Sequence, residues 1–201
     1  MSVAYFQFIE PGVLIDRELE LVAPEERWVD DQLAGCHHPL TQQDMPLQAR
    51  TTRESLLTFL RCNPRGHTVP DLLHGIAPQY TFWMRLSPGA TPRPAVPMAG
   101  SISLRLADTY NIEWYLGHIG YHVLPPARGH RYAERACRLI LPLARAHGFR
   151  SLWITCNPDN TPSRRTCERL GAELVEIIPV PRENPLYQQG DREKCRYRLE
   201  L

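Results

Sequence analysis

The chain has 201 residues, of which 43% are hydrophobic and 22% are charged, and this composition excludes an intrinsically disordered protein. A net charge of +1 gives no general attraction to nucleic acid or to a membrane surface, so neither is expected as a partner. The length suits a single domain with a sizeable core. The sequence has no apolar run long enough to span a membrane and no charged-then-apolar leader, so a cytoplasmic protein is predicted.

The first part of the chain is predicted to form an edge strand and two helices. Residues 17–22 alternate between charged and apolar side chains, which is typical of an edge strand. One helix begins at Pro24. A polar connection over 41–48 leads to a second helix, and Thr52 is expected to cap its first turn.

Alternation with a period of two then predicts strands. Residues 80–86 and 101–106 are expected to pair as antiparallel strands, joined by a proline-rich loop over 87–97. Residues 111–123 are predicted to form a third, longer strand. This part of the chain therefore supplies the first half of a sheet.

Helices and strands alternate in the second half. The pattern predicts a helix over 131–147, a short buried strand of the parallel type over 152–156, and a helix over 162–170. Two last strands are expected over 174–180 and 195–201. The order predicts the α/β class, with a mixed central sheet flanked by helices.

A metal site is not predicted. Cys36, His37 and His38 are adjacent in the sequence, and neighbouring residues rarely converge on one ion. No matching pair of ligands follows elsewhere in the chain. The six cysteines lie far apart without a C-x-x-C pair, and most are expected to be buried and reduced.

The most informative stretch follows Val123, where Pro125 and Pro126 end a strand and the next residues open a helix. The start of a helix carries backbone N–H groups without helical partners, and a basic cluster adds positive charge. The stretch is therefore expected to bind an anion such as a phosphate. The residues expected there are Arg128, Gly129, His130, Arg131, Tyr132 and Ala133.

This stretch resembles the signature Gln/Arg-x-x-Gly-x-Gly/Ala of the GCN5-related N-acetyltransferase (GNAT) superfamily. Arg128 fills the first position and Ala133 the last, whereas Arg131 stands where the central glycine usually lies. A second family element follows as Asn160-x-x-Ser163. Both elements occur in the family's order, around a helix of suitable length.

The resemblance implies a single-domain GNAT-like fold that binds acetyl-CoA. The strands at 117–123 and 152–156 would splay apart to admit the pantetheine arm of the coenzyme. The implied parts of the domain are a variable acceptor-side half at 17–97, a coenzyme-binding core at 98–180, and a late loop with the final strand at 181–201 within the whole chain, 1–201.

The coenzyme ligands follow from the same resemblance. Val123 would bind the pantetheine arm through its backbone, and the stretch 128–133 would cradle the pyrophosphate. Asn160 and Ser163 would reach the coenzyme from the other side. The alternatives are solvated surface charge for the arginines, and turn and capping chemistry for Asn160 and Ser163.

The catalytic candidates are four residues. Many relatives carry a tyrosine seven residues after the asparagine, placed to protonate the thiolate, and here that position is Cys167. Cys167 is a candidate acid, with core packing as its alternative, and Tyr187 in the late loop is a second candidate. Glu113 is the carboxylate of the strand 111–123, where partial burial would raise its pKa and suit it as a base. An exposed edge position is its alternative, and His122 is the second candidate base.

The sequence thus predicts an acetyl-CoA-dependent N-acetyltransferase that acts on a primary amine of a small molecule by direct transfer in a ternary complex. Two alternatives stay open. One is a non-catalytic module that binds or senses acyl-CoA, and the other is an acetyltransferase for protein or peptide amines. Relatives often pair through their final strands, so a homodimer is compatible with the apolar strand at 174–180.

Overall fold

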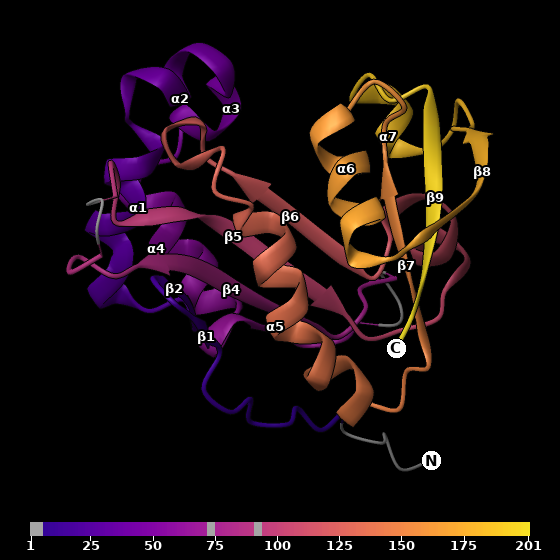
Figure 1. Cartoon of the computed structure of the whole chain (residues 1–201), viewed down its shortest axis with the longest axis horizontal. Coiled ribbons are helices and arrows are strands. Elements are labelled where there is room, and N and C mark those ends of the chain that lie inside the picture. The colour runs from indigo at the N-terminus through magenta and orange to yellow at the C-terminus, as the bar shows by residue number, and fades with distance from the viewer. Residues whose placement is uncertain (1–5, 72–74, 91–93) are drawn as a thin grey trace.

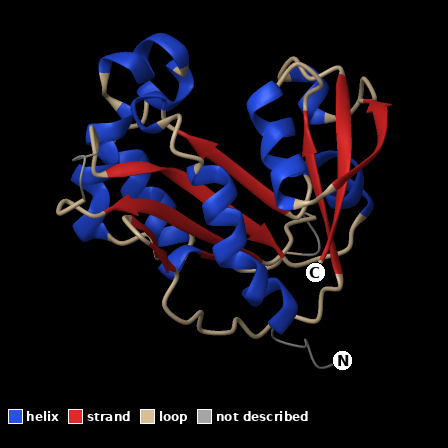
Figure 2. Ribbon diagram, in the orientation of Figure 1, coloured by secondary structure: helices blue, strands red, loops and turns tan. Residues whose placement is uncertain are grey.

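The computed structural model describes residues 6–71, 75–90 and 94–201 (Figure 1). Within these residues the strands form two sheets, drawn red in Figure 2, and helices cover both. The first sheet is six-stranded, and its strand pairs are antiparallel. Its strands are β1 (Ile15–Asp16), β2 (Leu19–Val22), β4 (Gln79–Leu86), β5 (Met98–Arg105) and β6 (Ile119–Val123) in that order, with β3 (His67–Thr68) paired to β4.

The second sheet has three strands, β7 (Ser151–Cys156), β9 (Glu193–Glu200) and β8 (Glu173–Pro179), in the order β7-β9-β8. β7 pairs antiparallel with β9, with Ile154 opposite Tyr197. The parallel type predicted for this strand was wrong for its pairing, because its ladder partner is the last strand of the chain, which runs the opposite way. β8 lies at the edge of the sheet, and pairing of two chains through it stays a prediction.

The predicted strand over 111–123 was wrong in its first half. Ile112–Leu116 forms a single π-helical turn, labelled η4, and only β6 is extended. Gly117 separates the two, with φ 71° and ψ 159°, a conformation that is essentially restricted to glycine. The alternating apolar residues that suggested a strand therefore lie partly in this turn. Tyr115 of the turn packs near Ile178, in a cluster separate from the main core.

Four helices follow β2 in the chain, and the first and last of them pack on one face of the first sheet against β4 and β5. They are α1 (Val29–Cys36), α2 (Pro39–Asp44), α3 (Pro46–Ala49) and α4 (Arg53–Cys62), after a 3-10 turn η1 (Glu26–Trp28). The Thr52 cap of α4 is confirmed, because its hydroxyl accepts from the N–H of Ser55. α2 and α3 occupy the stretch predicted as a polar connection. Each has proline in its first turn, and His38 caps α2.

The opposite face of the first sheet is covered by α5 (Tyr132–Ala146). Its stripe of Ala136, Ile140 and Ala144 is fully buried in the main core, as its period predicted. α6 (Thr161–Leu170) packs on β7 and β9 and against α5. The remaining elements are the 3-10 turns η2 (Pro64–Gly66) and η5 (Pro125–Ala127) and the short helix α7 (Pro185–Gln188).

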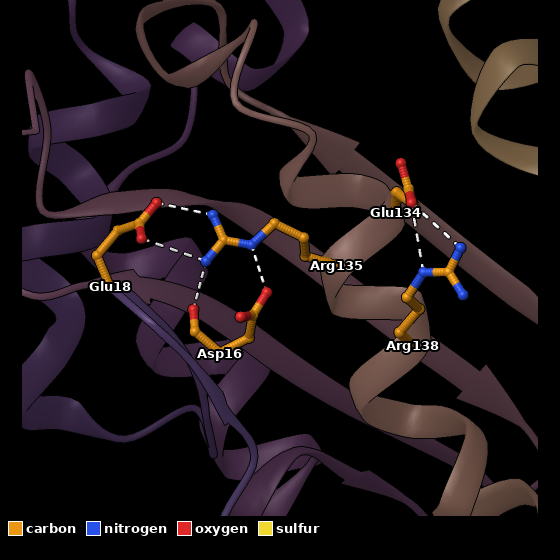
Figure 3. Close-up of polar contacts among 5 residues, drawn as sticks. All are labelled: Asp16, Glu18, Glu134, Arg135 and Arg138. Atoms are coloured by element: carbon orange, nitrogen blue, oxygen red, sulfur yellow. Dashed lines mark hydrogen bonds and ion pairs between the residues drawn. The ribbon is translucent and has the colours of Figure 1, made fainter. Parts of the chain in front are cut away.

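An ion-pair network ties α5 to the β1–β2 hairpin (Figure 3). The guanidinium of Arg135 donates to the Glu18 carboxylate at 2.7 Å and to the Asp16 carboxylate at 2.5 Å. Hydrogen bonding from Arg135 lowers the pKa of Glu18 to about 2. A second pair, Glu134 with Arg138, lies within α5. The Arg138 guanidinium also donates to the carbonyl of Arg169 on α6 at 2.6 Å. No helix in the described ranges is both long and apolar enough to cross a bilayer.

Candidate active site

β6 and β7 meet at one point and diverge from there (Figure 1). At that vertex His118 N–H donates to the carbonyl of Trp153 at 2.7 Å, and Trp153 N–H donates to Nδ1 of His118 at 2.9 Å. The other ring nitrogen of His118 lies 3.1 Å from Asp108 and therefore carries the proton, and burial lowers the pKa of the ring. The predicted splay is confirmed, since beyond the vertex the two strands belong to different sheets.

The loop after β6 presents a helix N-terminus to this opening. η5 follows the strand, and the chain then turns through Gly129 (φ 91°) and Arg131 (φ 56°, ψ 28°) before α5 begins. Arg131 is the residue before the first turn of α5, and no side chain caps that end. The first N–H groups of α5 are therefore available to an anion.

A cavity of about 730 Å³ lies between this loop, β6 and the start of α6. It brings together most of the residues predicted to hold the coenzyme, from three separate elements. Its lining is Met45, Tyr121, His122, Val123, Ala127, Arg128, Gly129, Arg131, Tyr132, Ala133, Asn160, Pro162, Ser163, Arg165, Thr166 and Arg169. His130 is absent from this lining. It stacks on Tyr132, with the ring centroids 5.4 Å apart, and faces a neighbouring hollow of about 580 Å³.

The cavity is strongly cationic. Nη1 of Arg128 lies 3.3 Å from the Asp44 carboxylate, which partly compensates the positive charge of Arg128. The guanidinium groups of Arg131, Arg165 and Arg169 make no hydrogen bond or ion pair with any residue that the structure describes. A cavity with unpaired guanidinium groups beside a free helix N-terminus attracts a multiply charged anion such as a pyrophosphate.

Asn160 and Ser163 stand at the start of α6. The Asn160 side chain accepts from Ser163 N–H at 3.2 Å, so Asn160 is the N-cap of α6. The Ser163 hydroxyl lies 2.9 Å from the hydroxyl of Tyr121 on β6. The capping alternative for Asn160 is thus present in the structure, and both residues also face the cavity.

The two candidate bases lie in different places. His122 lines the cavity, with Nδ1 3.2 Å from the Ser101 hydroxyl, and burial lowers its pKa. Glu113 lies in the η4 turn and faces a separate hollow of about 320 Å³ beside His118. The structure therefore groups His122, and not Glu113, with the loop 128–133.

The two candidate acids also lie outside the cavity lining. Cys167 is completely buried, and the neighbouring Cys156 thiol together with burial raises its pKa. Tyr187 lies in α7, where the Arg192 guanidinium stacks 4.0 Å from the ring centre, and it packs near Tyr115. Neither side chain lines the cavity.

Among the cavity residues that sequence reasoning missed are Tyr121, Arg165 and Arg169. Tyr121 has the same strand parity as Val123, which was assigned to the coenzyme, and strand alternation was a signal for it. Arg165 and Arg169 are four residues apart in α6, so they share a helix face. That face turns toward the cavity only because α6 packs against α5, which the local sequence does not encode.

No group of three or more metal-binding side chains comes together in the described ranges. No curated protein matches the sequence. The family model of the acetyltransferase (GNAT) domain matches residues 38–173, which is more than half of the chain.

The fold is similar to solved acetyltransferases. The chain matches microcin C7 self-immunity acetyltransferase MccE in complex with acetyl-CoA and AMP, with a TM-score of 0.65, 15% identity and 94% of each chain covered. It matches RimL, a ribosomal L7/L12 alpha-N-protein acetyltransferase in complex with coenzyme A, with a TM-score of 0.63, 21% identity and coverage of 94% and 98%. A GCN5-related N-acetyltransferase from Brucella melitensis gives a TM-score of 0.64 at 18% identity, covering 96% and 80%. With the splayed strands, the anion-binding loop and the family model in agreement, the chain belongs to the GNAT family of acetyltransferases.

Proposed function

We propose that this acetyltransferase moves the acetyl group of acetyl-CoA to a primary amine of a small molecule, by direct transfer in a ternary complex. The enzyme class and acetyl-CoA follow from the family, and the acceptor and the route are the proposal. The observation that carries it is the cavity between the diverging strands, with its free helix N-terminus and its unpaired guanidinium groups.

Coenzyme binding is assigned to the lining of this cavity. The pyrophosphate would lie against the loop 128–133, where backbone N–H groups and Arg131 face it. The pantetheine arm would run along Val123, because β6 has β5 on one side and no paired strand on the other among the described residues. Asn160 and Ser163 would approach from α6.

The direct route is supported by the lack of an activated nucleophile. The cavity lining contains no cysteine, and the hydroxyl of Ser163 is bonded to Tyr121 rather than to a base. The amine itself would therefore attack the thioester carbonyl, held close to it by the bound coenzyme.

His122 is assigned as the base that removes a proton from the amine nitrogen. When Nδ1–H donates to the Ser101 hydroxyl, Nε2 keeps a lone pair for that proton. Burial lowers the pKa of the ring, which keeps it in the neutral form, with a free lone pair, at pH 7.

The acceptor is assigned to small amines because the helical segment after α1 closes over the coenzyme loop. Met45, between α2 and α3, lines the cavity, and Asp44 contacts Arg128. A second candidate acceptor is a protein N-terminus, favoured by the similarity in fold to RimL, which is described as an alpha-N-protein acetyltransferase.

The test measures acetyl-CoA binding by isothermal titration and then free thiol release with a panel of small primary amines and a panel of short peptides. We expect micromolar binding, and thiol release at least tenfold faster with one or more small amines than with water alone. Faster release with peptides would identify a protein acetyltransferase. Binding without release in either panel would identify a non-catalytic acyl-CoA-binding module.

Arg131→Gly is expected to weaken acetyl-CoA binding about tenfold while leaving the free energy of unfolding within about 1 kcal/mol. Arg131 adopts a left-handed conformation that glycine adopts without steric cost, so the backbone of the loop is preserved and only the guanidinium is lost. Isothermal titration and thermal unfolding measure the two effects.

Arg65→Gly is the matched control, because Arg65 has the same φ of 56° but pairs with Glu10 outside the cavity. Its acetyl-CoA affinity should equal that of the wild type. Tighter or unchanged binding by Arg131→Gly would mean that the arginine side chain does not contact the coenzyme.

A further inference from the structure

We propose that Tyr121 is the catalytic acid that protonates the departing coenzyme thiolate, and that Ser163 is the residue that positions its hydroxyl. This inference rests on the proposed function and names a residue for the step that the four sequence-derived candidates leave unassigned. It is carried by the place of the Tyr121 side chain in the cavity.

Tyr121 bridges the two halves of the opening. It lies in the middle of β6, in the first sheet, and its hydroxyl lies 2.9 Å from the Ser163 hydroxyl in the first turn of α6. α6 packs on the second sheet, so this hydrogen bond spans the gap between the diverging strands. Both side chains line the cavity that receives the coenzyme. A hydroxyl that crosses this gap stands in the path of anything threaded between β6 and β7.

The other candidate acids lack this access. Cys167 is completely buried behind the lining, and Tyr187 packs in a different cluster around Tyr115. Among the described residues that line the cavity, Tyr121 and Tyr132 are the two phenols. Tyr132 opens α5 at the pyrophosphate end, which leaves Tyr121 for the thioester end next to Val123.

The surroundings of Tyr121 keep its proton in place until the reaction. Burial raises its pKa, and the thiols of Cys167 on α6, Cys137 on α5 and Cys156 on β7 act in the same direction, while the hydrogen bond from Ser163 acts against them. A thiolate formed in the same buried surroundings is also destabilised, so the pKa of the coenzyme thiol is raised together with that of the phenol.

The step conserves protons, because Tyr121 gives one and His122 takes one. The amine nitrogen bonds to the carbonyl carbon, the carbon–sulfur bond breaks with its electron pair left on sulfur, and the Tyr121 proton moves to that sulfur. The nitrogen loses one proton to His122. Exchange of these protons with water restores both side chains, so the products are the acetylated amine and the free coenzyme thiol.

Ser163 fits the role of a positioning residue. While Tyr121 donates to sulfur, the Ser163 hydroxyl can donate to the phenolic oxygen and stabilise the negative charge that develops there. Ser163 is also in the first turn of α6, capped by Asn160, where the helix dipole favours that charge.

The experiment compares wild type, Tyr121→Phe, Ser163→Ala and Ser163→Thr. It measures thiol release from acetyl-CoA with the best amine of the panel and with water as acceptor, the Kd for acetyl-CoA, and thermal unfolding. We expect Tyr121→Phe to lower kcat ten- to hundredfold with Kd within twofold, and to reduce the solvent isotope effect on kcat. Ser163→Ala should lower kcat less, and Ser163→Thr should restore it.

Tyr197→Phe is the matched control, because its buried hydroxyl bonds to Arg164, the neighbour of Ser163, but lies outside the cavity lining. Its kcat should stay within twofold of wild type. A kcat of Tyr121→Phe within twofold of wild type, or a loss matched by an equal loss in Kd or stability, would overturn the inference alone. A wild-type protein that binds acetyl-CoA and releases no thiol with any acceptor would overturn the proposed function, and the inference with it.

Discussion

Gly117→Ala is expected to destabilise the protein by about 3 kcal/mol and to abolish acetyl-CoA binding at concentrations that saturate the wild type. Gly117 has φ 71° and ψ 159°, which a residue with a side chain adopts only under strain. A Cβ there would lie 2.9 Å from the backbone nitrogen of Thr155 and 3.1 Å from the carbonyl oxygen of Trp153. Because those atoms belong to β7, the clash falls on the vertex from which the two strands diverge.

Gly120→Ala in the same segment is the control for this prediction. A Cβ at Gly120 would meet the ends of two side chains, the Ser103 hydroxyl at 3.0 Å and the Arg105 guanidinium at 3.2 Å, which can shift. The expected loss is below about 1 kcal/mol. Urea unfolding and isothermal titration of both variants make the comparison. Equal losses for the two alanines would show that the vertex has no special constraint.

Arg135→Met is expected to destabilise the protein by about 3 kcal/mol at pH 7, because it removes a largely buried guanidinium and leaves two carboxylates without their cationic partner. The Arg135 side chain is 16% exposed, and it joins α5 to Asp16 and Glu18 of the first hairpin (Figure 3). Arg138→Met is the control. Its guanidinium is 51% exposed and pairs with Glu134 in the same helix. It also donates to the Arg169 carbonyl of α6. For these exposed contacts a loss of about 1 kcal/mol is expected.

The same network sets a dependence on pH. The pKa of Glu18 is about 2 in the folded protein against an ordinary value of 4.5, chiefly because Arg135 donates a hydrogen bond to it. A lowered pKa means that the unfolded chain binds a proton first, so this contribution is complete above pH 4.5 and is lost as the pH falls from 4.5 toward 2. Wild type should therefore lose more stability than Arg135→Met between pH 5 and pH 3, as followed by urea unfolding. Parallel losses in the two proteins would contradict this origin.

Most regular elements were predictable because their signals are local. The apolar stripe of α5 and the Thr52 cap of α4 depend on residues within one or two turns. The turn at Ile112–Leu116 was not predictable in this way. Its apolar residues have strand-like spacing, and only the approach of β7 to Gly117 decides that the chain turns there.

The candidate site was likewise predictable only where its signals are local. The loop 128–133, predicted to bind the coenzyme, is one continuous stretch whose helix N-terminus and charges can be recognised in the sequence, and the structure gathers most of it around one cavity. The catalytic candidates come from separate segments, and their grouping depends on packing. His122 and Tyr121 face the cavity because β6 diverges from β7 at the vertex, whereas Glu113 precedes that point and faces elsewhere.

Among the described residues β6 pairs only with β5, and this unpaired edge also bears on the stability of the folded protein. The proposed position of the pantetheine arm along β6 would complete this sheet, so acetyl-CoA would act as a structural ligand as well as a reactant. At a coenzyme concentration one hundred times Kd, mass action adds about 2.7 kcal/mol to the free energy of unfolding. The abundance of the folded enzyme would then follow the supply of its coenzyme, and a cell short of acetyl-CoA would hold less of it.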